Sequence, residues 1–307
     1  MRKKQSSVAI LLTTYNGSKN IAKQLDSIIA QKYVNVKFFV SDDLSTDNTL
    51  ELVKNRVPKN QLIILRNKSK FGKPGLNFFS LIDRVEQDEF DYYAFSDQDD
   101  VWECNKLIEG ISLINKTNSD AYSSGFHLFY EHKGINKFIS KNPAQKLIDY
   151  LFSSPGPGCT FILKNKSYND LRLAYKNYKK IFNRCEYHDW AIYAFFRAKK
   201  LNWVIDNRSF IKYRQHEFND TGANYGLLAI YKRLLKFKDG TYENQIKNIV
   251  LLTKVFDPIT FNYLKTNSTI FYYRLLLKES RREIKERLLI FLISFLGLIK
   301  RKNIFYD

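Results

Sequence analysis

The chain is poor in cysteine, and its N-terminal segment, which mimics a signal peptide, has only a short apolar run. Only three cysteines occur among its 307 residues: Cys104, Cys159 and Cys185. An odd and widely spaced set fits neither a disulfide framework nor a zinc site, so we expect a reducing compartment. The N-terminal segment MRKKQSSVAILLTTYNG starts with basic residues but has no A-x-A-like cleavage site. We therefore expect its apolar run to form a first strand.

The chain also lacks a long apolar run. The run at 288–299 has twelve residues and lies between basic clusters, whereas a membrane-spanning helix needs about 20 apolar residues. A basic, apolar helix of this kind suits the surface of an anionic membrane. The alternative is a core or dimer helix that packs on residues 226–256.

Two common nucleotide-binding motifs are missing. No G-x-G-x-x-G follows the first predicted strand, and no G-x-x-x-x-G-K-[ST] occurs anywhere in the chain. Dinucleotide oxidoreductases and P-loop enzymes are therefore disfavoured. Internal repeats are absent too.

Acidic residues are in the minority, with 31 Asp and Glu against 50 Lys and Arg, for a formal net charge of +19. This excess predicts attraction to an anionic partner, namely nucleic acid, an acidic membrane or a phosphorylated substrate; the alternative is simple solubility. A nucleic-acid-binding protein is one hypothesis. No RRM-like or helix-turn-helix signature supports it, and acids cluster where a basic groove is needed, so we expect no nucleic-acid partner.

Apolar and aromatic residues are abundant, at 44 % and 15 %, and predict a well-buried core. Apolar strands are expected at 7–15, 36–41, 61–66 and 91–96. Helical spacing is found between them, at 18–31, 46–56 and 75–88. This alternation predicts a parallel sheet covered by helices.

The later chain is less regular. We expect strands at 122–131 and 160–164, a Pro/Gly loop at 153–159, a helix at 188–200, a loop at the end of 210–222, helices at 226–238 and 241–256, and a basic helical stretch from 270. The domain boundary is expected near 222–226, which divides the chain into 1–225 and 226–307.

Polar clusters follow three of the predicted strands, at 13–17, 42–43 and 97–100. Because parallel strands end on one edge of the sheet, these clusters should converge there. Carboxylates at i and i+2, such as Asp97 and Asp99, suit Mg²⁺ or Mn²⁺ with a substrate phosphate. The alternatives are structural: Asp100 caps a helix starting near 102, and the acids at 42–43 precede a helix capped by Ser45 or Thr46.

Six motifs in this order resemble a known family: TTYNG (13–17), SDDLSTDNT (41–49), SDQDDVW (96–102), PGPGCT (155–160), HDW (188–190) and YRQHEFNDTG (213–222). Together they resemble family 2 glycosyltransferases, and the third and last resemble bacterial rhamnosyltransferase-like members that build surface polysaccharides. The resemblance covers about 1–225. It implies an α/β GT-A fold, with a Rossmann-like nucleotide-binding mixed sheet flanked by helices, followed by a C-terminal helical extension. One departure is Leu44, where the family usually has Gly.

The resemblance also implies roles for individual residues. Those expected on the nucleotide sugar are Thr13, Tyr15, Asp42, Asp43, Asp97, Gln98 and Arg214. The metal, Mn²⁺ or Mg²⁺, is expected on Asp97, Asp99 and His216, with Asp99 as the direct ligand. From the residues alone, His216 is equally an ordinary loop histidine and Arg214 a surface ion-pair partner.

Asp189 matches the position of the catalytic base. Inverting sugar transfer needs a base that removes the proton of the acceptor hydroxyl, and a metal neutralises the departing nucleoside diphosphate. The structural alternative for Asp189 is a carboxylate that interacts with a helix dipole.

The resulting hypothesis is an inverting, metal-dependent glycosyltransferase. It would move a sugar from a dTDP- or UDP-linked donor, with dTDP-rhamnose favoured, to a glycan or lipid-linked acceptor. Location is expected in the cytoplasm, peripheral on the inner face of the cell membrane, with a homodimer through the C-terminal helices as a further option. The alternatives are a nucleotidyltransferase-like enzyme and a non-catalytic nucleic-acid- or glycan-binding protein.

Overall fold

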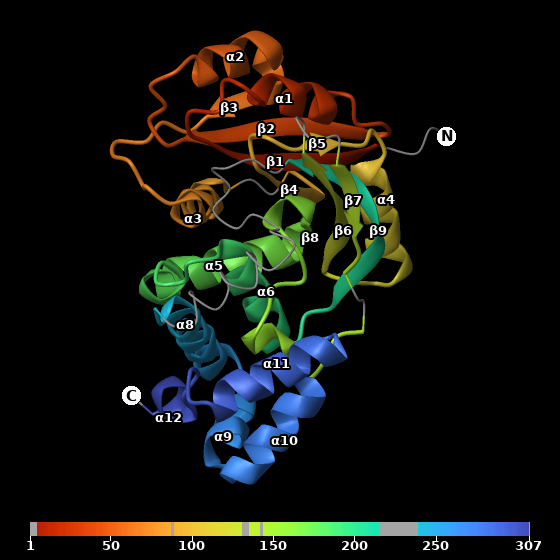
Figure 1. The fold of residues 1–307 in the computed structure, drawn as a ribbon. Helices are drawn as coiled ribbons and strands as arrows, with labels where there is room; N and C mark the ends of the chain where they lie inside the picture. Colours follow the sequence, from red (N-terminus) through yellow and green to blue (C-terminus); the bar gives the residue numbers. More distant parts are fainter. Residues whose placement is uncertain (1–4, 87–88, 131–134, 142–143, 215–238, 307) are drawn as a thin grey trace. The chain divides into compact units, whose positions relative to one another are not determined.

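The computed structural model describes residues 5–86, 89–130, 135–141, 144–214 and 239–306 (Figure 1). The chain forms two compact units. The first consists of 1–141, 156–179 and 201–216, and the second of 142–155, 180–200 and 217–307. The division into 1–225 and 226–307 stays a prediction, because residues 215–238 lie outside the described part of the chain.

The first unit begins with the alternation expected from the sequence. Its parallel strands are β1 (Ser6–Thr14), β2 (Val34–Asp42), β3 (Leu62–Ile64) and β4 (Tyr92–Ser96), in the order β3-β2-β1-β4. The connecting helices are α1 (Ile21–Ile29), α2 (Thr49–Arg56) and α3 (Pro74–Arg84), with a short 3₁₀ turn, η1 (Lys59–Gln61), before β3. Figure 1 shows α1 and α2 on one face of these strands and α3 on the other. Residues 8–12 of β1 are fully buried, as expected for a strand covered on both faces.

The sheet continues with strands of mixed direction. Beyond β4 come β8 (Ile162–Lys164), β6 (Ala121–Tyr130), β9 (Trp203–Arg214) and β5 (Val101–Trp102), and β7 (Ile135–Ile139) pairs with β6. β8 is antiparallel to β4 and to β6, whereas β6 and β9 are parallel. The nine-stranded mixed sheet with flanking helices confirms the predicted α/β fold class.

Three predictions for this region were wrong or incomplete. No strand was predicted before the loop at the end of 210–222, but Trp203–Arg214 forms β9, which pairs with β6 and β5. The helix expected near 102 begins later, as α4 (Lys106–Lys116), since Val101 and Trp102 pair with β9. The long helix α5 (Asn165–Phe182) was not predicted; it has a non-helical residue at Tyr178, near the division between the two units.

The second unit is helical. Its elements are η2 (Asp149–Leu151), α6 (His188–Ala198), α8 (Thr241–Phe256), α9 (Pro258–Thr266), α10 (Thr269–Glu279), α11 (Ile284–Phe295) and α12 (Arg301–Phe305). The helices expected at 188–200 and 241–256 are confirmed as α6 and α8. The helix expected at 226–238 lies outside the described residues. Among the described helices, none has the length and apolar character needed to cross a bilayer.

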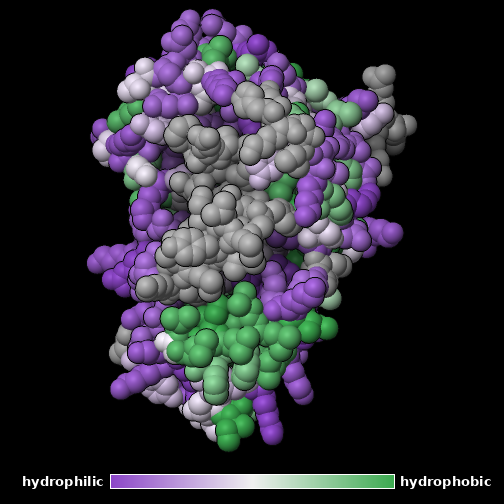
Figure 2. Space-filling view, in the orientation of Figure 1, coloured by the Kyte–Doolittle hydropathy of each residue, from purple (hydrophilic) through white to green (hydrophobic). Residues whose placement is uncertain are grey.

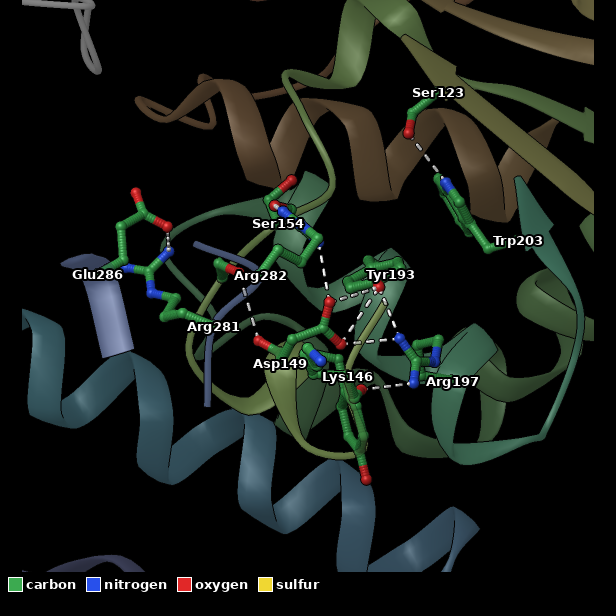
Figure 3. Close-up of polar contacts among 12 residues, drawn as sticks. Ser123, Lys146, Asp149, Ser154, Tyr193, Arg197, Trp203, Arg281, Arg282 and Glu286 are labelled. Atoms are coloured by element: carbon green, nitrogen blue, oxygen red, sulfur yellow. Dashed lines mark hydrogen bonds and ion pairs between the residues drawn. The ribbon is translucent and has the colours of Figure 1, made fainter. Parts of the chain in front are cut away.

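A buried carboxylate joins three segments of the second unit (Figure 3). Asp149 in η2 is fully buried. Its Oδ1 accepts a hydrogen bond from Arg197 Nη1 at 2.8 Å, and its Oδ2 accepts one from Arg282 Nη1 at 3.0 Å. The hydroxyl of Tyr193 donates to Oδ2 at 3.1 Å. The network therefore ties η2 to α6 and to the segment that precedes α11.

Replacing Asp149 by Asn should lower the free energy of unfolding by about 3 kcal/mol, because two arginines lose the carboxylate that offsets their charge. Asp26→Asn is the matched control. Asp26 also pairs with an arginine, Arg56, but that pair is exposed and should contribute at most about 1 kcal/mol. Equal effects of the two substitutions on thermal or urea unfolding would contradict the assigned importance of the network.

Candidate functional site

The carboxyl end of β2 presents an oriented carboxylate. Asp42 is paired in register with Thr14 of β1, and Thr14 Oγ1 donates to Asp42 Oδ1 at 2.7 Å. Ser45 adds hydrogen bonds from its hydroxyl, at 2.6 Å to Oδ1, and from its backbone N–H, at 2.7 Å to Oδ2. The side chain is thus fixed at the end of the strand by three hydrogen-bond donors.

Asp43 organises the loop before α3. Its Oδ1 accepts the backbone N–H of Phe71 at 2.5 Å, and its Oδ2 accepts that of Gly72 at 2.9 Å. Gly72 has a φ of 71°, a conformation that suits glycine. In the described structure Asp43 therefore shapes the loop beside Asp42. Thr13, the remaining residue expected here, is buried in β1 opposite Ser41.

Gln98 connects the ends of β1 and β4. Its Oε1 accepts the backbone N–H of Tyr15 at 2.9 Å, and its Nε2 donates to the Tyr15 carbonyl at 3.0 Å. A Cβ on Gly17 would lie 2.2 Å from Gln98 Oε1, so only glycine allows this approach. The loop at 42–45 joins the same region, because Asn16 N–H donates to Ser45 Oγ at 2.8 Å. The three polar clusters thus converge, as the topology predicted.

Tyr15 is exposed at this edge, with 40 % of its surface accessible. Lys70 Nζ lies 3.8 Å from the ring centroid and 2.5 Å from the hydroxyl oxygen. An exposed aromatic ring beside an ammonium group is suited to contact with a planar, anionic ligand such as a nucleotide.

The candidate cation site contains Asp97, Asp100 and Cys159, whose potential ligand atoms all lie within 4.8 Å of one another. Asp100 is fully buried. Its Oδ1 accepts the backbone N–H of Arg214 at 3.1 Å, whereas its Oδ2 has no hydrogen-bond partner within the described residues. Burial raises the pKa of Asp100 well above its usual range, and the charges of Asp99 and Asp97 raise it further.

The charge of this cluster needs a cation or a proton to offset it. Lys106 Nζ lies 3.4 Å from the ring centroid of Trp102, and among described residues it has no hydrogen-bond partner. Burial lowers the pKa of Lys106 to about 7, against the opposing charges of Cys159 and Asp100. Because burial disfavours its charged form, Lys106 offsets the carboxylates only in part.

The donor set fits a hard divalent ion. Carboxylate oxygens of Asp97 and Asp100 are the ligands that Mg²⁺ and Mn²⁺ prefer. The Cys159 thiol is a weak ligand, because burial raises its pKa well above the usual value and a protonated thiol coordinates poorly. The unsatisfied Oδ2 of Asp100 is the observation that favours a cation here.

Asp99 and Arg214 lie beside this cluster without joining it. Arg214 Nε donates to the backbone carbonyl of Asp99 at 2.9 Å, and its guanidinium lies 5.4 Å from the ring centroid of Phe129. Because Arg214 is buried, its alternative role as a surface ion-pair residue was wrong. Asp99 as the direct metal ligand stays a prediction, and His216 lies outside the described residues.

Two structural alternatives for the acids are also wrong. The residue at the N-cap of α4 is Asn105, so Asp100 does not cap that helix. The N-cap of α2 is Asn48, beyond Ser45 and Thr46. Sequence reasoning missed Asp100 and Cys159 as partners of Asp97. The adjacent acids after β4 and the Gly158-Cys159 turn were the available signals, but neither indicates which side chains meet.

Asp189 lies in the second unit, in the first turn of α6. Its Oδ1 accepts the backbone N–H of Trp190 at 2.8 Å. The side chain is half-buried, while Trp190 itself is buried and donates from Nε1 to the Tyr150 carbonyl at 2.6 Å. The packing of Trp190 thus fixes the helix end that carries Asp189, and the helix N-terminus stabilises its negative charge.

Comparison with known proteins identifies the family. Residues 9–197 match the family described as "Glycosyl transferase family 2". The chain belongs to glycosyl transferase family 2. It is 38 % identical over 240 residues to the dTDP-rhamnosyl transferase RfbG of Shigella flexneri, covering 78 % of this chain and 83 % of that protein. Over 164 residues it is 27 % identical to an Escherichia coli protein, WfgD, named UDP-Glc:alpha-D-GlcNAc-diphosphoundecaprenol beta-1,3-glucosyltransferase, covering 52 % and 60 %.

Solved structures agree on the fold. TarS of Staphylococcus aureus, residues 1–349, superposes with a TM-score of 0.55 at 17 % identity, covering 97 % of this chain and 82 % of that one. The mannosyltransferase PcManGT of Pyrobaculum calidifontis, solved with GDP-Man and Mn²⁺, gives a TM-score of 0.50 at 14 % identity, covering 95 % and 88 %. The predicted family and GT-A fold are confirmed, and the protein is a glycosyltransferase.

This family 2 glycosyltransferase departs from the D-D-G-S pattern at Leu44. Leu44 has a φ of 61°, in the left-handed region, and its side chain is exposed. A leucine there is strained, because its Cβ crowds the backbone. The loop thus keeps a backbone conformation suited to glycine, and Asp42 and Asp43 keep their places beside it.

Leu44→Gly should raise the free energy of unfolding by about 1 kcal/mol, because the backbone strain at this position is removed. Leu52→Gly, in the middle of α2, is the control and should lower it by about 1 kcal/mol. Thermal unfolding of both variants shows whether each substitution raises or lowers the free energy of unfolding. A destabilised Leu44→Gly variant would show that contacts of the leucine side chain outweigh the strain.

Proposed function

We propose that this glycosyltransferase transfers rhamnose from dTDP-rhamnose, with inversion and with the help of a divalent metal, to a glycan or lipid-linked acceptor of a bacterial surface polysaccharide. The observation that carries the proposal is the pair formed by the half-buried Asp97 and the buried Asp100, whose Oδ2 has no hydrogen-bond partner among the described residues, beside the edge formed by Tyr15, Asp42 and Gln98. The 38 % sequence identity to a dTDP-rhamnosyl transferase supports dTDP-rhamnose as the donor.

The donor would lie on the edge of the sheet. We infer that the base contacts Tyr15 and that Asp42, with Thr13 behind it, receives the nucleoside. Gln98 and Asp43 act by shaping the adjoining loops, through their bonds to Tyr15, Phe71 and Gly72. The charge of Lys70 at 3.8 Å from the Tyr15 ring favours an anionic ligand at this place.

Asp97 and Asp100 would hold Mn²⁺ or Mg²⁺, and Asp99 and His216 are further candidates. When bound, the ion supplies positive charge that stabilises the departing nucleoside diphosphate. The protein's own contribution is to hold the carboxylates in a buried place, where their repulsion is relieved by the cation.

Asp189 would act as the base. The acceptor oxygen forms a bond to the anomeric carbon as the bond from that carbon to the diphosphate oxygen breaks. The proton of the acceptor hydroxyl passes to the Asp189 carboxylate. The positive end of the helix dipole stabilises the negative charge of this carboxylate, which is the form that accepts a proton.

The acceptor and location are inferred from the same reaction class. A polysaccharide assembled on a lipid carrier would require the enzyme on the inner face of the cell membrane, so we propose a cytoplasmic protein attached peripherally. The alternative is that the C-terminal helices form a homodimer instead of contacting the membrane.

The test of donor and metal is thermal unfolding with dTDP, UDP and GDP, each with and without Mn²⁺. We expect dTDP with Mn²⁺ to raise the midpoint by about 5 °C at about 100 times its dissociation constant. Asp100→Asn should abolish the part that needs Mn²⁺, whereas the exposed Asp26→Asn should retain it. Asp99→Asn tests the other candidate ligand: if Asp99 binds the metal, this variant should also lose the part of the rise that needs Mn²⁺. A midpoint unchanged by every nucleotide would contradict the proposal.

Asp189→Asn should reduce transfer from dTDP-rhamnose at least about 100-fold, because the amide cannot accept the proton. The Mn²⁺-dependent rise in unfolding midpoint with dTDP should remain, since the donor residues are intact. Glu186→Gln removes a nearby exposed carboxylate and should leave transfer unchanged. Full activity of Asp189→Asn would refute its role as the base.

A further inference from the structure

The helix α11 exposes an unusually apolar face. Ile284, Leu288, Leu292 and Phe295 follow one another at helical spacing, and Phe295 is 65 % and Ile284 66 % exposed. The remaining exposed apolar side chains of this face and the turn after it are Leu289, Leu296 and Leu298. Figure 2 shows a continuous hydrophobic patch where Figure 1 places α11. We call these seven residues the α11 face.

The opposite side of α11 already has its partners. Ile290 and Ile293 on that side are buried. At the edge of the α11 face, the rings of Phe291 and Phe295 stack 5.9 Å apart and lie 5.7 and 6.0 Å from the ring of Tyr273 in α10. The helix is therefore anchored by packing on one side. Isolated exposed apolar residues are common on protein surfaces, but contiguous ones are not. The α11 face is contiguous and therefore indicates an interaction site.

Basic residues surround the α11 face. Residues 278–302 contain eight Lys and Arg and three Glu, which gives a net charge of +5. Lys285 is exposed between Ile284 and Leu288 at the start of the helix, and Lys300 and Lys302 follow its end. The four arginines of this range are held by other groups: Arg282 by the buried Asp149, Arg281 by Tyr242 and Glu286, and Arg287 and Arg301 by backbone carbonyls.

The positive charge around the α11 face favours an anionic bilayer over a second copy of the chain as its partner. A second copy of the chain, docked face to face, would bring two sets of like charges together, which opposes the contact. An anionic bilayer instead accepts apolar side chains at the level of its acyl chains and basic side chains at its phosphates. The length of α11, twelve residues, suits a helix lying in the membrane plane.

We propose that the α11 face docks the enzyme onto an anionic lipid surface, with α11 parallel to the membrane plane and its apolar side chains inserted below the headgroups. This deepens the proposed function and rests on it, since it supplies the contact with a membrane that a lipid-linked acceptor requires. The network at Asp149 joins the segment before α11 to α6, so the docked helix and the helix that carries Asp189 belong to one unit.

The experiment is co-sedimentation of the full chain with vesicles, without nucleotide. We expect binding to phosphatidylcholine vesicles that contain about one third phosphatidylglycerol, weak binding to phosphatidylcholine alone, and a decrease in about 0.5 M NaCl. The triple variant Leu292→Ser, Phe295→Ser, Leu296→Ser should bind at least about tenfold more weakly. The control is Leu173→Ser, which changes a leucine of α5 that is 52 % exposed, against 51 % for Leu292.

Several outcomes would overturn the proposal. Equal binding by the triple variant and the wild type would exclude the α11 face. A dimer in analytical ultracentrifugation that the triple variant dissociates would assign the face to a second copy. A lowered unfolding midpoint of the triple variant would show that the protein itself covers the face. Asp100→Asn should bind vesicles normally, so failure of membrane docking is distinguishable from failure of the proposed metal and donor sites.

Discussion

The carboxyl group of Asp100, buried beneath the end of β4, is the constraint on which the candidate site depends. Asp100 has no solvent contact and one oxygen without a hydrogen-bond partner in the described structure, with Asp97 nearby and Asp99 adding to the field. Such a group is costly in an empty site and favourable once a cation is present. Lys106, which burial brings to a pKa of about 7, reduces this cost only in part.

Hydrogen bonds hold the polar side chains at the edge of the sheet in fixed orientations. Asp42 receives three hydrogen bonds, Asp43 holds two backbone N–H groups of the loop before α3, and Gln98 bridges the ends of β1 and β4. Apart from the two bonds that Ser45 donates to Asp42, these bonds join segments that are far apart in the sequence. Fixed polar groups of this kind suit a site that binds a charged leaving group, because their orientation is set before the ligand arrives.

The second unit combines a buried ion-pair network with an exposed apolar surface. Its interior contains the fully buried Asp149, bound by Arg197 of α6 and by Arg282 near the C-terminus. Its surface carries the α11 face, whose apolar side chains have basic neighbours. Since Arg282 belongs to both the buried network and the segment before α11, the C-terminal helices are part of the structure that supports Asp189 and are more than an appended tail.

The sequence by itself determined the first four strands, their connecting helices and the convergence of the three polar clusters, because hydrophobic periodicity and the geometry of parallel strands are local properties. Its ordered motifs also pointed to the correct family. Only the tertiary structure decided that Asp100 is buried, that Cys159 lies beside it and that 210–214 belongs to β9. These facts depend on pairings between distant segments, such as Trp102 with Ile211 and Arg214 with Asp100. The left-handed conformation of Leu44 and the exposed side of α11 likewise follow from packing that no local pattern encodes.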